Sequence, residues 1–309
     1  MYLLPILVTI LLSVQCGFAY KILVYSPKFA HSHINFMGSI ADTLADAGHN
    51  VTTLMPVLDQ NMRNGTTKSN IIYLMGSQQS MANHAHLMGQ FANLFQTKLF
   101  NLPVALVQGK SFARLFSQLC REVIETEGLL DRLKNEHYDV MLTENFDMCG
   151  MAMSHYIAPT ATCMTSTSVL FGEQFEELGV PKMLSFNPSE LFYMSRQINL
   201  LGPVRQWTDV LFQEKFGPDY PTIQDITSRV AYAFTNAEPL INFASPTLHR
   251  VIDVGGMGAT PPKQLDEHWL EVLSRRPRTV LISFGSVTQS CQLDHELKRS
   301  ILKVGLAKR

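Results

Sequence analysis

Apolar positions in the first part of the chain repeat with two different periods. Residues 21–26, KILVYS, form a short apolar run with branched side chains, which is typical of a buried strand. Between positions 34 and 45 apolar residues recur at helical spacing, and Gly48 is placed to end the helix that this spacing predicts. Residues 51–55 form the next apolar run and predict a second strand. Strand, helix and strand in this order predict a βαβ unit and a parallel sheet with right-handed crossovers.

The same alternation of strand and helix patterns continues as far as residue 235. Four phenylalanines lie at helical spacing in this part of the chain: Phe91, Phe95, Phe112 and Phe116. Such residues belong to the core more often than to a ligand pocket, and one sequence does not show which of the four belong to each. The prolines and aromatic residues of 170–225 predict short helices and loops. Further strands are predicted at 71–75, 138–143, 162–167 and 230–235, and helices within 80–135 and at 148–156.

The composition changes after residue 250. Three glycines in VGGMG (254–258) and a pair of prolines soon after them predict a linker between two domains. A helix at 269–275, a strand at 279–284 and a helix at 293–306 then predict the first βα unit of a second domain. The expected organisation is a signal peptide (1–19), a first domain (20–250), a linker with a helix (251–278) and the start of a second domain (279–309).

The N-terminal segment predicts entry into the secretory pathway. About twelve apolar residues between Leu3 and Val14 are too short a run to span ~30 Å of hydrocarbon, and Gly17 and Ala19 are the small residues that a cleavage site before Tyr20 needs. An uncleaved N-terminal anchor is the alternative. Two glycosylation sequons fit a lumenal location, at Asn64 in a polar loop and, less favourably, at Asn50, where a strand follows at once.

Charge and cysteine content exclude several classes of protein. The chain has 309 residues, 46% of them hydrophobic, which is enough for a large core and excludes a disordered chain. With 25 Lys and Arg against 26 Asp and Glu, it lacks the basic excess of a nucleic-acid-binding protein. Cys120, Cys149, Cys163 and Cys291 are too widely spaced for a disulfide framework or a metal site, and Cys149 and Cys163 are predicted to be buried free thiols.

Candidate catalytic residues follow two of the predicted strands. Ligands of such sheets bind beyond the carboxyl ends of the strands. His33 lies at the start of the first helix, behind Ser32 as the expected N-cap, where the positive end of the helix dipole disfavours a charged imidazolium and favours a general base. Glu144 follows the strand at 138–143 and would accept the imidazole N–H; Asp147 competes for that role, or either carboxylate caps the next helix. His31 is the competing histidine.

The turn after the strand at 279–284 is a weaker candidate. Gly285 and Ser286 would offer backbone N–H groups and a hydroxyl to phosphate oxygens. The GGMG at 255–258 lacks the spacing of a dinucleotide-binding loop, and the scattered histidines share no metal-ligand pattern, so no metal site is predicted.

These segments together resemble the UDP-glycosyltransferases of the glucuronosyltransferase type, in their animal, secretory-pathway branch. The resemblance extends over the whole mature chain in the family's order and spacing. It is carried by SHINFMGSIADTLADAGHNVTTL (32–54), YDVMLTENFDMCGMAMSHYIAPT (138–160), FTNAEPLINF (234–243), VGGMG (254–258) and RPRTVLISFGSV (276–287).

The resemblance implies a GT-B type α/β fold with two Rossmann-like domains. The first would bind a small lipophilic acceptor and the second a UDP-sugar, UDP-glucuronate or UDP-glucose, which is a co-substrate, so that no cofactor is needed. The reaction would be an inverting, metal-independent transfer in which the family's base maps onto His33, its acidic partner onto Glu144 in place of the usual Asp, and its donor-side serine onto Ser286. Family members reside in the endoplasmic reticulum, anchored in the membrane by a C-terminal helix, and form homo- or hetero-oligomers.

The family's donor-binding signature and C-terminal membrane helix do not occur in this sequence. The resemblance therefore covers the acceptor domain and only the first βα unit of the donor domain, whose apolar faces we expect to be exposed to solvent. Two functions are left: transferase chemistry, which the family indicates, and a catalytically inactive truncated form that binds an acceptor or a partner.

Overall fold

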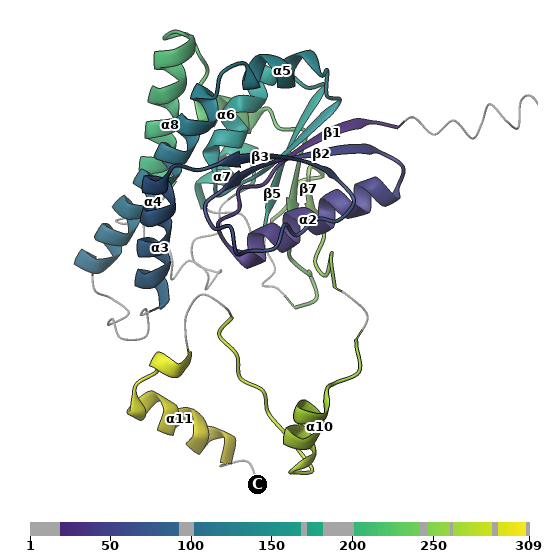
Figure 1. Ribbon diagram of the computed structural model, residues 1–309, viewed down its shortest axis with the longest axis vertical. Helices are drawn as coiled ribbons and strands as arrows, with labels where there is room; N and C mark the ends of the chain where they lie inside the picture. Colours follow the sequence, from purple (N-terminus) through teal and green to yellow (C-terminus); the bar gives the residue numbers. More distant parts are fainter. Residues whose placement is uncertain are drawn as a thin grey trace, which may run out of the picture.

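The computed structural model describes residues 19–92, 102–167, 172–181, 201–241, 246–259, 262–285 and 290–306. Its centre is a seven-stranded parallel sheet in the order β3-β2-β1-β4-β5-β6-β7, with helices on both faces (Figure 1). The α/β fold class predicted from the sequence is confirmed for this domain. The strands are β1 (Lys21–Tyr25), β2 (Asn50–Val57), β3 (Asn70–Met75), β4 (Val140–Glu144), β5 (Ala161–Ser166), β6 (Tyr232–Thr235) and β7 (Val251–Asp253).

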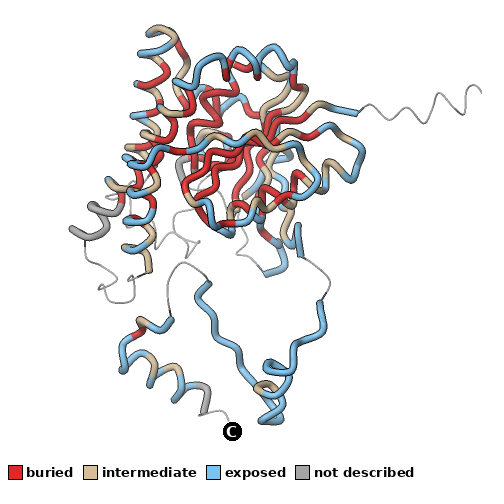
Figure 2. The backbone as a smooth tube through the Cα atoms, viewed as in Figure 1, coloured by how far each residue is buried: buried red, intermediate tan, exposed pale blue. Residues whose placement is uncertain are grey.

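Alternate residues of the central strand β1 enter two different cores. Ile22 and Val24 pack with helix α2 (His31–Asp46), whereas Leu23 and Tyr25 pack with the helices of the other face. Both faces of the sheet are covered, so β1 is buried along nearly its whole length (Figure 2). The second face carries α3 (Gln78–Ala92), α4 (Leu102–Glu125), α5 (Leu129–Asn135), α6 (Met148–Ile157), α8 (Leu201–Phe216) and α9 (Ile223–Ser228), and α7 (Gly172–Leu178) packs on α9.

Helix α2 begins two residues earlier than its sequence suggested. Ala30 is the N-cap and offers no capping side chain, so the expectation that Ser32 caps the helix is wrong, and His33 is the third helical residue. The prediction for the other end is confirmed, because Gly48 follows the helix with φ of +90°, a conformation that a residue with a side chain rarely adopts.

The loop between β2 and β3 is fastened across α2. Gly65 lies so close to the helix that a Cβ there would be 2.1 Å from the carbonyl oxygen of Ile34. The Asp42 carboxylate accepts hydrogen bonds from the backbone N–H groups of Thr67 and Lys68, each at 3.0 Å, and from the Thr66 hydroxyl. This loop therefore cannot move without breaking several charge-assisted hydrogen bonds.

The two sequons differ in their surroundings. Asn64 is half-buried: its Nδ2 donates to the Tyr73 hydroxyl at 2.6 Å and its Oδ1 accepts from Lys28 Nζ at 3.2 Å. Asn50, the first residue of β2, is exposed. The folded protein thus presents Asn50 more openly than Asn64, although Asn64 was the sequon that the sequence favoured.

The sheet continues into the segment expected to be a linker. Residues Val251–Asp253 form β7 beside β6, and Gly255 lies so close to Ala237 that a Cβ there would be 2.4 Å from its carbonyl oxygen. A Cβ at Gly258 would likewise lie 2.2 Å from Ser39 Oγ. Gly255 and Gly258 therefore pack against the domain and are needed for close approach. Gly256, with φ of +81° and no atom within 4 Å of where a Cβ would lie, is needed for turning.

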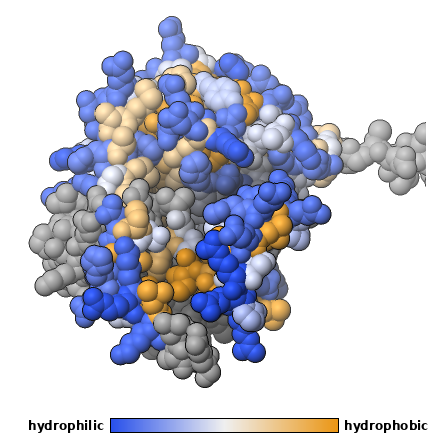
Figure 3. All heavy atoms as spheres, turned by 60° about the horizontal axis from the view of Figure 1, so that its bottom comes forward, coloured by the Kyte–Doolittle hydropathy of each residue, from blue (hydrophilic) through white to orange (hydrophobic). Residues whose placement is uncertain are grey.

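The segment predicted to be a strand at 279–284 is not in a sheet. It is exposed, with Val280 at 77% and Leu281 at 78% of full exposure, because no described strand lies beside it to pair with. Helices were predicted on either side of it, and both are present as α10 (Glu267–Ser274) and α11 (His295–Leu306). Figure 3 brings this end of the molecule forward and shows apolar groups gathered among polar ones on its surface. The expected exposure of these apolar faces is confirmed.

Within the described ranges, the structure contains no helix that is both long and apolar enough to cross a bilayer. The segment predicted to be a signal peptide lies outside these ranges, except for its last residue.

A buried disulfide joins α4 to the first turn of α6. It links Cys120 to Cys149, and both residues are 1% exposed. The expectation that Cys149 is a free thiol is wrong, because helix packing brings together two residues that are far apart in sequence; Cys163 is buried and free, as predicted. A disulfide of this kind persists in an oxidising compartment.

We expect the Cys120→Ala/Cys149→Ala protein to be less stable than the wild type. Losing the cross-link between residues 29 positions apart lowers the free energy of unfolding by about 4 kcal/mol, because the unfolded chain regains loop entropy. Urea titrations with and without a reductant measure the difference. Cys163→Ala is the control and should keep the wild-type response to the reductant; a wild-type protein whose stability does not change on reduction would contradict the prediction.

Candidate functional site

His33 and Glu144 meet at the carboxyl edge of the sheet. β1 and β4 are neighbouring parallel strands, so the loop after β1 and the end of β4 lie side by side. His33 is in the first turn of α2, and Glu144 is the last residue of β4. His33 Nδ1 forms a hydrogen bond with Glu144 Oε1, and the two side chains are 13% and 1% exposed. The structure therefore joins the histidine and the carboxylate that the sequence paired from strand positions.

The hydrogen bond to Glu144 determines which nitrogen of His33 is available. With Nδ1–H donating to the carboxylate, Nε2 carries the lone pair. Nε2 forms no hydrogen bond with any residue of the described ranges, while the Thr167 hydroxyl lies 3.4 Å from Nδ1. The ring thus presents a basic nitrogen that is held in orientation from behind.

Two aromatic rings fix the plane of the His33 imidazole. The Phe29 ring lies 4.6 Å from it, centroid to centroid, and the Phe146 ring meets it edge-on at 5.0 Å. Phe112 and Phe116 continue this cluster into the core, and both are buried. The sequence did not single out Phe29 or Phe146, although each stands within four residues of a candidate site residue.

Asn145 anchors the loop that carries Glu144. Its side-chain Nδ2 donates to Ser166 Oγ and to Gln174 Oε1, each at 3.0 Å, and its backbone N–H donates to the Thr165 carbonyl at 2.8 Å. Asn145 is 1% exposed, so these bonds are shielded from water. Sequence reasoning missed this residue, because an asparagine after a strand is an ordinary turn residue until its partners are known.

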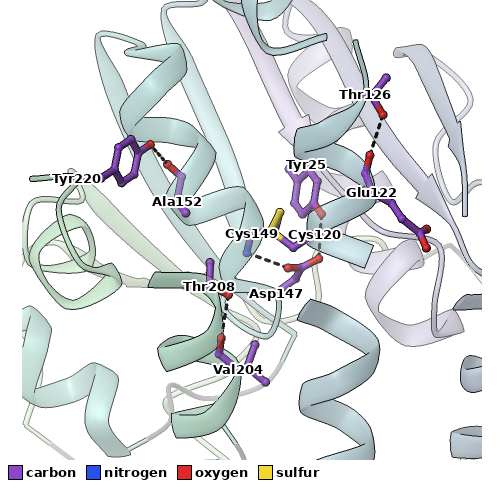
Figure 4. The surroundings of a disulfide bond; sticks show 10 residues. All are labelled: Tyr25, Cys120, Glu122, Thr126, Asp147, Cys149, Ala152, Val204, Thr208 and Tyr220. Carbon is purple, nitrogen blue, oxygen red and sulfur yellow. Dashed lines mark hydrogen bonds between the residues drawn. A yellow bond between two sulfur atoms is a disulfide. The ribbon is translucent and has the colours of Figure 1, made fainter. Parts of the chain in front are cut away.

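Asp147 has a separate role. It is the N-cap of α6: one oxygen accepts the Cys149 backbone N–H at 2.9 Å and the other accepts the Tyr25 hydroxyl at 3.0 Å (Figure 4). Both carboxylate oxygens are occupied by these partners, and neither bonds His33. The alternative pairing of His33 with Asp147 is therefore not the one that the structure adopts.

Burial makes Asp147 reluctant to ionise. Removal from water raises the pKa of its carboxyl group to about 7, with a smaller contribution from the nearby Glu144 charge, against the hydrogen bonds that favour ionisation. The same burial, together with the Asp147 charge, raises the pKa of Tyr25 well above its ordinary value. Asp147 and Tyr25 are therefore a buried, hydrogen-bonded pair in which both groups lose their protons less readily than they do in water.

A cavity of about 670 Å³ opens beside His31, between the start of α2, the loop after β2 and α3. Met62, Met81 and Met88 line this cavity, and their flexible side chains suit apolar ligands of variable shape. His84, which also lines the cavity, bonds the Phe29 carbonyl through Nε2 at 2.6 Å and so ties α3 to the loop before His33.

The donor-side turn is only partly visible. Gly285 is exposed, has φ of +80° and ends an extended segment that belongs to no sheet. Ser286 lies outside the described residues. The phosphate-binding role predicted for this turn stays a prediction.

We expect Asp147→Asn to change how stability depends on pH. Between about pH 4 and 7 the unfolded chain has released the Asp147 proton and the folded chain retains it, so the wild type loses stability as the pH rises. The variant has no such proton to release. Its free energy of unfolding relative to the wild type should rise by about 4 kcal/mol between pH 4 and pH 7.5, measured by chemical denaturation.

Asp225→Asn is the matched control with the opposite sign. Hydrogen bonds from Thr222 lower the pKa of Asp225, so its removal should cost stability at neutral pH and little at acid pH. Parallel pH profiles of the wild type and Asp147→Asn would contradict the assignment of a raised pKa to Asp147.

Comparison with known proteins finds relatives of this chain by sequence. The family model described as UDP-glucoronosyl and UDP-glucosyl transferase matches residues 20–307. The chain is 27% identical to ugt-47 of Caenorhabditis elegans, a protein named as a UDP-glucuronosyltransferase, over 97% of this chain and 59% of the relative. It is 25% identical to UDP-glucuronosyltransferase 3A2 of Homo sapiens, over 89% of this chain and 55% of that protein. It therefore spans a little over half the length of these relatives.

Among solved structures, the spinosyn forosaminyltransferase SpnP is similar with a TM-score of 0.49 and 15% identity, over 94% of this chain and 64% of that one. The calicheamicin glycosyltransferase CalG4 has a TM-score of 0.48 and 12% identity, over 76% of this chain and 53% of that one. The family model matches residues 20–307 of the 309, so the chain belongs to the UDP-glucoronosyl and UDP-glucosyl transferase family.

Proposed function

We propose that this chain carries the acceptor-activating part of a UDP-glycosyltransferase, which transfers glucuronosyl or glucosyl groups from a UDP-sugar to hydroxyl groups of small lipophilic acceptors. The observation that carries the proposal is the His33–Glu144 hydrogen bond, with Nε2 of His33 left available at the carboxyl edge of the sheet. A neutral imidazole oriented by a carboxylate is the usual arrangement of a general base that activates a hydroxyl.

In this mechanism His33 Nε2 takes the proton of the acceptor hydroxyl while the acceptor oxygen attacks the anomeric carbon of the sugar. The bond between that carbon and the UDP oxygen breaks on the opposite face, so the configuration inverts and UDP leaves with the bonding electrons. Glu144, 1% exposed, stabilises the imidazolium that forms, because its negative charge is held close to Nδ1 in a poorly hydrated place. No metal or cofactor takes part in the proposed step.

The methionine-rich cavity beside His31 is the proposed acceptor site. Its volume of about 670 Å³ suits one small organic molecule, and its methionines offer an apolar, adaptable wall. The aromatic rings around His33 exclude water on one side of the base, which strengthens the electrostatic support from Glu144.

The donor side rests on the family. The human relative is named as a UDP-glucuronosyltransferase and a Rattus norvegicus relative as a 2-hydroxyacylsphingosine 1-beta-galactosyltransferase, so UDP-sugars are the proposed co-substrates. Gly285 and Ser286 are the residues of this chain proposed to approach the donor diphosphate. A secretory location, with membrane anchoring and oligomer formation as in family members, is proposed with it; the buried disulfide and the sequons are compatible with that compartment.

We expect His33→Ala to lower the kcat of sugar transfer by roughly 10²–10⁴-fold with little change in KM, because it removes proton transfer and leaves the acceptor cavity in place. Glu144→Gln should also lower kcat, since a neutral amide no longer stabilises the imidazolium. The measurement is transfer from radiolabelled UDP-glucuronate or UDP-glucose to a panel of phenols and alcohols.

Two histidine variants make the assay specific. His31→Ala separates the competing histidine from His33 and should reduce kcat much less. His49→Ala, near the opposite end of α2, should leave transfer unchanged. Full turnover in His33→Ala would contradict the base assignment.

The second candidate function is acceptor binding without transfer. The exposed segment 279–284, which pairs with no described strand, favours it, because a donor site needs an ordered domain to position the sugar nucleotide. Calorimetry distinguishes the two: binding of an acceptor with neither UDP binding nor transfer supports the binding module, whereas turnover that depends on His33 contradicts it.

A further inference from the structure

A second hollow lies on the other side of α3, between α4 and α8. Its volume is about 600 Å³, within the range of small-molecule sites. The three helices lie side by side at one edge of the domain (Figure 1). The acceptor cavity contacts Met81, His84, Ala85 and Met88 on one face of α3, whereas the second hollow contacts Asn83 on the opposite face. The two hollows share no lining residue among those described.

One wall is a polar stripe of α4. Arg114, Ser117, Gln118 and Arg121 follow one another at helical spacing, so they lie along one face over about 10 Å. Arg121 has carboxylate neighbours, Glu125 at 3.3 Å and Glu214 at 3.6 Å.

Arg114 is exposed and forms neither an ion pair nor a hydrogen bond with the residues that the structure describes. The positive charge at the Arg114 end of the stripe is therefore uncompensated within those ranges, whereas that at the Arg121 end is balanced.

Ser117 adds an independent observation. It is 4% exposed, and its hydroxyl is buried with no hydrogen-bond partner. Helical Ser and Thr residues commonly bond the carbonyl four residues earlier, as Thr208 of α8 does with Val204 at 2.8 Å. Thr126, the residue after α4, forms the same bond with Glu122, also at 2.8 Å (Figure 4). Leaving a buried hydroxyl unpaired costs about 1–3 kcal/mol, a cost that a ligand oxygen at this wall would remove.

The opposite wall, on α8, is largely apolar and open to solvent, with Gln206 as its polar member. Trp207 is 50% and Val210 47% exposed, and Leu211 is buried behind them. Positions 207, 210 and 211 lie on one face of the helix, turned to the stripe of α4. A half-exposed indole facing an uncompensated guanidinium favours a ligand with a flat apolar body and one anionic group.

We propose that the hollow between α4 and α8 is a binding site for an amphipathic organic acid, separate from the His33 site. The carboxylate bonds the Arg114 guanidinium and accepts a hydrogen bond from the Ser117 hydroxyl, while the apolar body lies against Trp207 and Val210. Binding here ties α4 to α8. Helix α4 also carries Phe112 and Phe116, whose rings contact the two phenylalanines beside His33, and Cys120, which forms the disulfide to α6.

Fluorescence titration with 2-naphthoate tests the proposal, with 2-naphthamide as the neutral probe of the same shape. The chain has two tryptophans, so a Trp269→Phe background leaves Trp207 as the single reporter. In that background 2-naphthoate should quench Trp207 at a saturable site and 2-naphthamide should bind at least 10-fold more weakly. Arg114→Gln should weaken 2-naphthoate at least 10-fold with no effect on 2-naphthamide, and Ser117→Ala should weaken it about 5-fold.

Arg132→Gln is the matched control, since Arg132 is an exposed arginine of α5 that does not line the hollow, and it should bind like the parent. Equal affinity for the two probes, or an unchanged affinity in Arg114→Gln, would overturn the proposal. Displacement of 2-naphthoate by excess UDP would contradict the proposal that the hollow between α4 and α8 is separate from the site for the UDP-sugar. If the protein bound phosphatidylglycerol vesicles through Arg114 but showed no saturable binding of 2-naphthoate, the organic-acid site would be contradicted and a membrane contact supported.

Discussion

The parallel pairing of β1 with β4 at the middle of the sheet is the constraint on which the candidate site depends. It sets Tyr25 opposite Thr143, so the residues just beyond each strand emerge together at the same edge. His33 comes from the helix that β1 feeds and Glu144 from the end of β4, and no local sequence motif links residues 111 positions apart. A register shift of one residue would turn Glu144 to the other face of the sheet and break the pair.

The first turn of α6 supports this edge from below. Asp147 caps the helix and holds the Tyr25 hydroxyl, while the next residue but one, Cys149, fastens α6 to α4 through the disulfide. Glu144 and Asp147, three residues apart, thus have different roles because their surroundings differ. Glu144 faces the imidazole at the site, and Asp147 is buried against a phenol and a helix end, with its pKa raised to about 7. The sequence could not assign these two roles, because Glu144 and Asp147 both lie where β4 ends and α6 begins. The contacts in the fold assign them.

The C-terminal segments lack the strand pairing that organises the sheet. Residues 279–284 have the composition of a buried strand, yet they remain exposed and unpaired with the described strands. A strand needs at least one hydrogen-bonded neighbour and a covered face, so its sequence pattern alone does not form it. Helices α10 and α11 do form, because their hydrogen bonds are internal and each begins behind an aspartate whose side chain accepts a first-turn N–H, Asp266 for α10 and Asp294 for α11.

Several features could be read from the sequence because they arise locally. The strand and helix order, the end of α2 at Gly48 and the placement of His33 and Glu144 beyond strands follow from periodicity, φ preferences and the geometry of parallel sheets. The disulfide, the Asn145 anchor, the aromatic frame of His33 and the unpaired Ser117 hydroxyl did not follow, since each depends on which distant helices and loops pack together. The sequence by itself determined the family and most of the strands and helices, but neither the addition of β7 to the sheet nor the unpaired state of residues 279–284. The tertiary structure decided which carboxylate meets the histidine and which cysteines pair, because both are set by distances across the fold rather than along the chain.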